Sequence, residues 1–421
     1  MDPSSSPNTT PPHRPRFGAN YVPSNGWFYS WLDFRPDDVR RDFEDLAGLG
    51  LDHVRVFPVW PWVQPNRALI RPAALDDLLT TIDLAAEAGL DVAVDLLQGH
   101  LSSFDFLPSW VLTWHRRSVF GDATVRQGLR HYVDTVTRAV ATRDNVFAVT
   151  LGNEVNNLWP SNGTSVETSS EWARELVDVA RAAAPGRTVL HSLYDDAFYA
   201  PSHPFTPADV VGIGDVSSVH SWVFNGVAAL DGPLGPATTS HADYLVELAH
   251  AASTEPHRPV WLQEVGAPRP EISEADVHSF VHATVGQACQ NPALWGVTWW
   301  CSHDLSRNLV DFPEREYDLG LFTTDHRAKP VARALAEIIA EPPEAVSSRA
   351  GMVCDVDLLT EPQRRAEVAP GGDFHRHWVE ARAIGPTAIV PAQHRDDAAW
   401  LAARGVTHLV PTPMAAVRGI S

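Results

Sequence analysis

Two glutamates follow apolar runs of the sequence, and their side chains are the best placed for chemistry. Glu154 follows the run 146–152, and Glu264 closes the shorter run 260–264. An apolar, β-branched run of this length is typical of a buried strand of a parallel sheet. The repeated pattern indicates a carboxylate at the end of each of two strands. A solvated turn is the alternative for Glu154.

The elements that would position these glutamates alternate in type along the chain. Strands are predicted over 17–22, 52–57, 90–97, within 146–156, and over 188–193, 216–222, 260–264 and 294–301. Helices are predicted over 36–49, 73–88, 122–142, 167–184, 241–252, 273–289 and 330–339. This alternation predicts a (β/α)₈ barrel. An open doubly wound sheet is the alternative, but no Gly-x-Gly-x-x-Gly follows the first strand.

The pattern also suggests where the barrel begins and ends. Residues 1–15 are rich in Pro, Ser and Thr and predict a disordered lead, which leaves 16–341 for the barrel. Residues 342–421 predict a small α/β appendage with strands over 387–391 and 407–410, a helix over 396–404 and a frayed tail after 411.

Composition excludes several classes of function. The net charge of −20, without a basic patch, argues against nucleic acid or an anionic membrane as partner. The N-terminus has no apolar export signal and no segment is long and apolar enough to cross a bilayer, so we predict a cytoplasmic protein. Three scattered cysteines argue against a disulfide framework. Oligomeric state cannot be read from the sequence.

Motifs for competing chemistries are missing from the sequence. It contains no Gly-x-Ser-x-Gly, Walker A, His-Glu-x-x-His or Cys-x-x-Cys pattern. The segment Cys301-Ser302-His303-Asp304 has side chains that could bind a metal, but no second cluster stands at ligand spacing. We therefore expect no metal and no cofactor.

The barrel prediction brings the two glutamates to one place. Active sites of such barrels lie where the strands end and the following loops begin. Two carboxylates that face each other there suit glycoside hydrolysis, in which one group protonates the leaving oxygen and the other attacks or activates water. A separation of about 5 Å implies retention of configuration, and about 6.5 Å or more implies inversion. A small oligosaccharide or glycoside is therefore the expected substrate.

Other polar and aromatic residues are predicted at the same end of the barrel. Arg55, His100 and His220 end or follow strands. Arg55 would lower the pKa of a carboxylate beside it, and apolar surroundings would raise the pKa of the other carboxylate. For a single aromatic residue, core packing is the alternative, but many in loops at one face favour a substrate wall. The tryptophans proposed for this wall include Trp60, Trp114, Trp159, Trp299 and Trp300.

At these residues the chain resembles glycoside hydrolase family 5, the cellulase and mannanase group of retaining barrel enzymes. The resemblance covers residues 17–339 and rests on Gly152-Asn153-Glu154, Trp261-Leu262-Gln263-Glu264 and Trp299-Trp300. It implies that Glu154 is the acid/base, Glu264 the nucleophile and Asn153 the contact to the sugar 2-hydroxyl.

The resemblance assigns further roles and shows one departure. It implies that Arg55 lies behind the nucleophile, that Trp300 or Trp299 forms a platform under the −1 sugar, and that His100 and His220 match histidines of the third and sixth strands. The family usually has His-x-Tyr on strand six, whereas this chain has His220-Ser221-Trp222. An indole can donate a hydrogen bond to the nucleophile but cannot exchange a proton.

Several longer segments resemble the intracellular β-mannosidase-like branch, subfamily 18. They are 20–24, 60–61, 98–106 and 114–117. This branch is associated with mannose β-1,4-linked to N-acetylglucosamine, and the long third loop favours removal of a terminal sugar. The leading hypothesis is a retaining exo-β-mannosidase. An endo-acting mannanase or glucanase and a non-catalytic sugar-binding barrel are the alternatives.

Overall fold

The computed structural model describes residues 14–98, 100–114 and 117–411. Most of the predicted lead, the tail beyond residue 411, and parts of the segments 98–106 and 114–117 lie outside these residues. Within the described part of the chain, no helix has both the length and the apolar character needed to cross a membrane.

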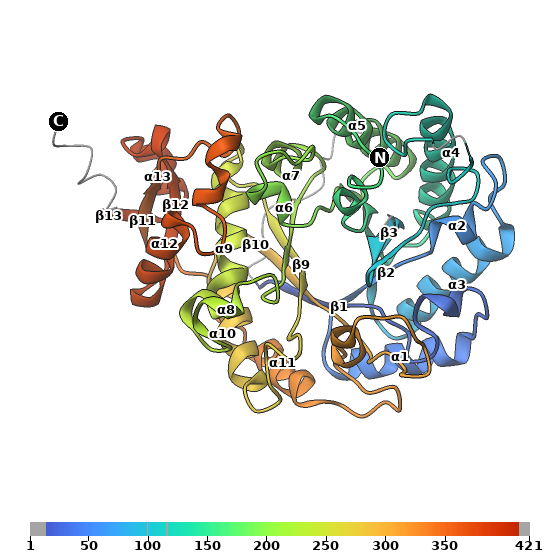
Figure 1. Cartoon of the computed structure of the whole chain (residues 1–421). Helices are drawn as coiled ribbons and strands as arrows, with labels where there is room; N and C mark the ends of the chain where they lie inside the picture. The colour runs from blue at the N-terminus through green and yellow to red at the C-terminus, as the bar shows by residue number, and fades with distance from the viewer. Residues whose placement is uncertain (1–13, 99, 115–116, 412–421) are drawn as a thin grey trace.

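Eight parallel strands form the central sheet (Figure 1). Their hydrogen-bonded order is β7-β6-β3-β2-β1-β10-β9-β8, which curls the sheet into a nearly closed barrel. The strands are β1 (Arg16–Asn20), β2 (His53–Val56), β3 (Asp91–Leu97), β6 (Val146–Gly152), β7 (Thr188–Leu190), β8 (Ser217–Ser221), β9 (Val260–Val265) and β10 (Leu294–Trp299). Each is buried along almost its whole length, as expected for strands covered on both faces.

The barrel closes differently between β7 and β8, which are the two ends of the hydrogen-bonded order. An isolated bridge joins Leu190 to Gly214 there. Asp215 adds two contacts with Val189: its backbone N–H donates to the Val189 carbonyl at 2.8 Å, and its carboxylate accepts from the Val189 N–H at 2.8 Å. The Asp215 side chain thus replaces one of the backbone hydrogen bonds that adjacent strands would otherwise make.

Helices surround the barrel. The longer ones are α1 (Pro36–Gly48), α3 (Pro72–Glu87), α4 (Ala123–Val140), α5 (Val166–Ala183), α9 (Pro236–Ala252), α10 (Val277–Cys289) and α11 (Pro330–Ala340). Proline is the first residue of α1, α3, α9 and α11, where its missing N–H costs nothing. Asp122 caps α4 by accepting from the N–H groups of Thr124 and Val125.

The predicted barrel is confirmed, and the differences are local. All predicted strands and long helices are present, with ends that shift by a few residues. The prediction missed the short helices α2 (Trp60–Val63), α6 (Asp196–Tyr199), α7 (Pro207–Gly212) and α8 (Ala228–Asp231). It also missed a hairpin of β4 (His100–Leu101) and β5 (Phe104–Asp105), because elements of two to six residues have too few turns or alternations to show a period.

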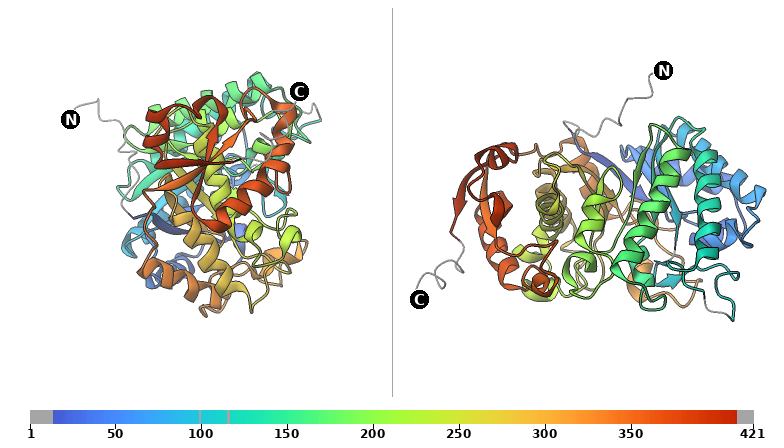
Figure 2. Two further views of the ribbon diagram at one scale, coloured as in Figure 1. Left: turned by 90° about the vertical axis from the view of Figure 1, so that its left-hand side faces the viewer. Right: turned by 90° about the horizontal axis from the view of Figure 1, so that it is seen from above.

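A second, three-stranded parallel sheet lies beside the barrel in the C-terminal part of the chain (Figure 2). Its order is β12-β11-β13, with β11 (Arg349–Cys354), β12 (Thr387–Pro391) and β13 (Val406–Val410), and α12 (Asp373–Ile384) and α13 (Ala398–Ala403) accompany it. The expected elements β12, α13 and β13 are present. The sequence did not reveal β11 or α12.

Helix α9 lies between the barrel and this C-terminal sheet (Figure 1), and all its residues after Pro236 are buried. Glu247 of α9 forms an ion pair with Arg349 of β11 and accepts from the Ile389 N–H of β12 at 2.9 Å. Asp243, one turn earlier, pairs with Arg382 of α12 at 2.6 Å. Buried charged pairs therefore join the two parts of the molecule.

The Glu247–Arg349 pair gives a test of this junction. Glu247→Ala leaves a buried guanidinium without its charge partner, so we expect the free energy of unfolding in urea to fall by about 3–5 kcal/mol. Glu87→Ala, which removes a surface pair with Arg40, is the control and should cost less than about 1 kcal/mol. Equal losses in the two variants would contradict the role given to α9.

Candidate active site

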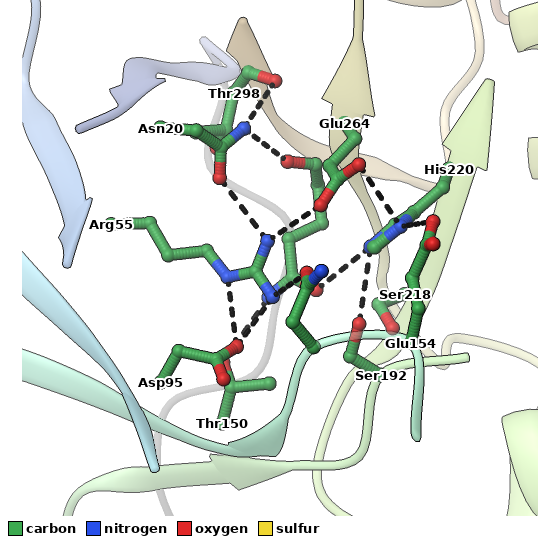
Figure 3. Close-up of polar contacts among 12 residues, drawn as sticks. Asn20, Arg55, Asp95, Thr150, Glu154, Ser192, Ser218, His220, Glu264 and Thr298 are labelled. Atoms are coloured by element: carbon green, nitrogen blue, oxygen red, sulfur yellow. Dashed lines mark hydrogen bonds and ion pairs between the residues drawn. The ribbon is translucent and has the colours of Figure 1, made fainter. Parts of the chain in front are cut away.

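The guanidinium of Arg55 lies at the centre of the site and is fully buried (Figure 3). It donates to Asp95 of β3, to the Asn20 side-chain oxygen at 3.1 Å, to the Asn153 side-chain oxygen at 2.8 Å and to Glu264 Oε1 at 3.0 Å. These contacts come from strands β1, β3 and β9 and from the residue after β6. Arg55 thus fixes the nucleophile candidate relative to neighbouring side chains.

Glu264 sits in β9, with its carboxylate held from several sides. Trp222 donates its indole N–H to Glu264 Oε2 at 3.2 Å, and His220 Nδ1 lies 3.3 Å from the same oxygen. Burial and the negative charge of Glu154 raise the pKa of Glu264, while His220 and Arg55 oppose the shift. Arg55 thus acts on this pKa in the predicted direction, but the net shift is upward because loss of hydration outweighs the guanidinium.

Glu154 follows β6 in an unusual backbone conformation. Its φ of 44° lies in the left-handed region, which turns the chain sharply at the strand end. Gly152, two residues earlier, lets β6 lie close to β3, because a Cβ there would lie 2.5 Å from the Leu97 carbonyl oxygen. Glu154 Oε1 lies 2.7 Å from His220 Nδ1, and its Oε2 accepts from the Asn157 amide at 2.9 Å.

His220 lies between the two glutamates (Figure 3). Burial lowers the pKa of His220, but Glu264 and Glu154 outweigh it and raise the pKa overall. Its other ring nitrogen lies 3.1 Å from Ser192 Oγ. The three side chains therefore form one coupled set, with a carboxylate oxygen of each glutamate and His220 Nδ1 all within 4.8 Å of one another.

A cavity of about 370 Å³ opens over these groups. Of the predicted site residues it contains His100, Asn153, Glu154, Trp222, Glu264 and Trp300. The carbonyl of His100 accepts from the Asn153 amide at 3.1 Å, and its Nδ1 lies 2.9 Å from Asp105. Arg55 and His220 are not among the lining residues but both contact Glu264, which is.

Four of the predicted wall tryptophans are not among the residues that line this cavity. Trp60 is 1% exposed and packs on Trp110, and Trp299 is 0% exposed beside α10 and α11. Trp159 contacts the His203 ring. Trp114 is 89% exposed. Successive strand residues point to opposite faces, so Trp299 and Trp300 could not both be platforms.

Sequence reasoning missed several residues of the cavity. They are Ser102, Ser103, Asn157, Tyr194, Phe224 and Glu316. Asn157 follows the Gly-Asn-Glu motif by three positions and could have been found from that proximity. Tyr194 and Glu316 come from long connections after β7 and β10. The sequence of such a connection does not show which of its side chains point toward the cavity.

Comparison with solved structures gives a close match. The crystal structure of a GH5_18 variant from Streptomyces cattleya in complex with Manβ1-4GlcNAc is 49% identical, with a TM-score of 0.91, covering 94% of this chain and 98% of that one. A GH5_18 protein from Bifidobacterium longum subsp. infantis is 40% identical, with a TM-score of 0.89 and coverage of 96% and 97%.

The chain belongs to glycoside hydrolase family 5, subfamily 18. It is therefore a glycosidase by family. The exo-β-1,4-mannosidase Op5Man5 from Opitutaceae bacterium strain TAV5, at 20% identity and a TM-score of 0.75, shares the fold. No family model and no curated protein sequence matches the chain.

In this GH5_18 chain the indole N–H of Trp222 stabilises the Glu264 carboxylate by donating a hydrogen bond to it. Trp222→Phe keeps an aromatic ring but removes a hydrogen bond to a charged group, worth about 1.5–3 kcal/mol, so kcat/KM should fall roughly 10- to 100-fold. The acid limb of the pH profile should move upward, since the variant loses a donor to the ionised form. Trp159→Phe is the matched control and should leave both quantities unchanged.

Glu316 adds a third carboxyl group to the cavity. Burial raises its pKa to about 7, and the charge of Glu264 adds to this. Because folding raises this pKa, the ionised form costs stability, and the cost grows as pH rises from about 4.5 to about 7.

Glu316→Gln should therefore raise Tm relative to the wild type more at about pH 8 than at about pH 5. Thermal unfolding of both proteins across this range measures the difference. Glu314→Gln on the same loop, with a more exposed side chain, is the control and should show no such dependence. A Tm difference that does not change with pH would contradict the raised pKa of Glu316.

Proposed function

We propose that this chain is a retaining exo-β-mannosidase that removes a terminal β-linked mannose, with Manβ1-4GlcNAc as its substrate. The observation that supports it most is the pair Glu154 and Glu264, which bring carboxylate oxygens within 4.8 Å of each other at one cavity. Relatives of 49% and 39% identity were crystallised with Manβ1-4GlcNAc, which supports the choice of substrate. A cytoplasmic location stays a prediction.

The spacing of the carboxylates favours retention. Retaining glycosidases hold their two carboxyl groups about 5–5.5 Å apart, whereas inverting enzymes need about 6.5–9.5 Å to admit a water molecule. The two carboxylates have oxygens that approach within 4.8 Å, which fits the shorter of these spacings. Glu264 is therefore assigned to direct attack on the anomeric carbon.

In the first step a carboxylate oxygen of Glu264 attacks C1 of the mannose, and the bond from C1 to the glycosidic oxygen breaks. Glu154 gives its proton to that oxygen, so the N-acetylglucosamine leaves as an alcohol. Arg55 and Trp222 hold Glu264 in the attacking orientation by donating to its two oxygens. By the family resemblance, Asn153 contacts the 2-hydroxyl of the sugar.

In the second step Glu154, now ionised, takes a proton from water while the water oxygen attacks C1. The ester bond to Glu264 breaks and its negative charge returns. Arg55, buried beside it, stabilises the returning charge without needing to reorganise. His220 lies against both carboxylates and stabilises whichever of them is ionised.

The walls of the cavity favour exo cleavage. The β4–β5 hairpin supplies His100, Ser102 and Ser103, while the connection after β10 supplies Glu316. These segments reach the cavity from loops at different points of the chain and limit it to about 370 Å³. Such a space suits a short saccharide better than the interior of a long polymer.

Kinetics of the two glutamate variants test the assignment. Glu264→Ala should lower kcat by several orders of magnitude for every glycoside, because the covalent intermediate cannot form. Glu154→Ala should be slow on Manβ1-4GlcNAc but much less impaired on aryl β-mannosides whose leaving group needs no proton. Near-wild-type rates of either variant on Manβ1-4GlcNAc would end the assignment.

A substrate panel separates the remaining alternatives. The proposal expects release of mannose from Manβ1-4GlcNAc and from aryl β-mannoside, with aryl β-glucoside turned over far more slowly. Internal cleavage of long mannan oligosaccharides would favour an endo-acting enzyme. Binding without turnover across the whole panel would favour a non-catalytic barrel.

A further inference from the structure

Three groups of His, Asp and Glu side chains in the described residues bring ligand atoms close enough to hold one metal ion. One is the catalytic set of Glu154, His220 and Glu264, and a second is exposed on α10 and α11. The third consists of Asp42, His303 and His326, which Asp45 joins through its contacts with both histidines. We name these four residues the α1 cluster.

The α1 cluster joins parts of the chain that are far apart in sequence. Asp42 and Asp45 lie three positions apart on α1, so their side chains share one face of the helix. His303 follows β10 in the same segment as the cavity residue Trp300. His326 belongs to the connection that leads to α11.

His303 lies near tetrahedral ligand spacing from both carboxylates of the α1 cluster, whereas His326 is closer than this to Asp45 and farther from Asp42. Zn²⁺ binds nitrogen and oxygen at about 2.0–2.1 Å, which places tetrahedral ligands about 3.3–3.4 Å apart. His303 Nε2 lies 3.4 Å from Asp45 Oδ2 and 3.6 Å from Asp42 Oδ1. His326 Nδ1 lies 3.9 Å from Asp42 Oδ1 and 2.6 Å from Asp45 Oδ2.

One oxygen of Asp42 is the independent sign of a ligand. Asp42 is 0% exposed, and its Oδ1 has no hydrogen-bond partner among the described residues. Its Oδ2 accepts from the Tyr21 hydroxyl at 2.8 Å and from the Ser24 N–H at 3.1 Å. These two bonds fix the carboxylate so that the unused oxygen faces His303 and His326. A buried carboxylate oxygen without a donor is costly unless a cation or proton meets it.

We propose that the α1 cluster binds a divalent transition metal ion, Zn²⁺ first, through His303 Nε2, His326 Nδ1 and the carboxylates of Asp42 and Asp45. Imidazole and carboxylate together suit Zn²⁺, and two carboxylates balance its charge. The ion replaces the direct hydrogen bond between His326 and Asp45. With four protein ligands the site is closed and structural, and it ties α1 to the segment that follows β10.

The exposed group on α10 and α11 provides a matched control. His278 and His282 both contact Glu337, with side chains that are 56%, 39% and 57% exposed, respectively. These residues can bind metal weakly, as surface histidine pairs do, but nothing fixes them in place. Double substitution His278→Asn with His282→Asn removes this group without touching the α1 cluster.

The test is titration of the full-length, tag-free chain with ZnCl₂ after treatment with chelator, followed by calorimetry and thermal unfolding. We expect one tight site per chain and a rise in Tm of at least about 3 °C with saturating Zn²⁺. His326→Asn, chosen because Asn tolerates the left-handed φ of 65° at this position, should weaken binding at least about 100-fold and remove the shift. The His278/His282 double variant should keep both the tight binding of Zn²⁺ and the rise in Tm.

Other outcomes overturn the proposal. Tight binding that survives His326→Asn but disappears in the control variant would place the ion on α10 and α11. No uptake of Zn²⁺, Mn²⁺ or Ni²⁺ by the wild type would mean that the α1 cluster is a network of hydrogen bonds only. If His326→Asn fails to fold, Asp45→Asn answers the same question, because Asp45 is partly exposed and on the outer side of the group.

Discussion

The buried charge of Arg55 is the interaction on which the site depends. A guanidinium without water is tolerated only when each of its N–H groups has an acceptor. Arg55 has five N–H groups, and it makes five hydrogen bonds: two to Asp95 and one each to Asn20, Asn153 and Glu264. The need to satisfy this one side chain therefore fixes residues from several strands at once.

The same charge sets the electrostatics of the cavity. Burial raises the pKa of Asp95 to about 6 although Arg55 opposes it, and the pKa of Glu264 is raised as well. The site thus holds more potential negative charge than one arginine neutralises, and the raised pKa of His220 follows from that excess. Both Glu264 and His220 therefore have raised pKa values beside each other, which suits a cycle in which a carboxylate changes charge at each step.

Strand periodicity explains how far the sequence could predict this arrangement. Arg55, Glu154 and Glu264 could be predicted because each lies at or near the end of a strong apolar run, and barrel geometry then brings such ends together. The sequence did not show that Trp60 and Trp299 are buried in the core, because a tryptophan near a strand end can point either into the core or toward the cavity. Glu316 comes from a connection without periodicity. Strand β11 contains Arg349 and Gly351, which interrupt its apolar pattern. The ion pair between Arg349 and Glu247 of α9 joins residues far apart in the sequence, so no local pattern predicts it.

Helix α9 has a consequence for how this enzyme can vary. An outer helix of a barrel normally turns a polar face to water, so domains beside it can be gained or lost with little disturbance. Here that face is occupied by Asp243 and Glu247, whose arginine partners belong to α12 and to the C-terminal sheet. A protein that loses or exchanges this sheet must also replace the buried acidic residues of α9. The barrel and the C-terminal sheet are therefore expected to be inherited together.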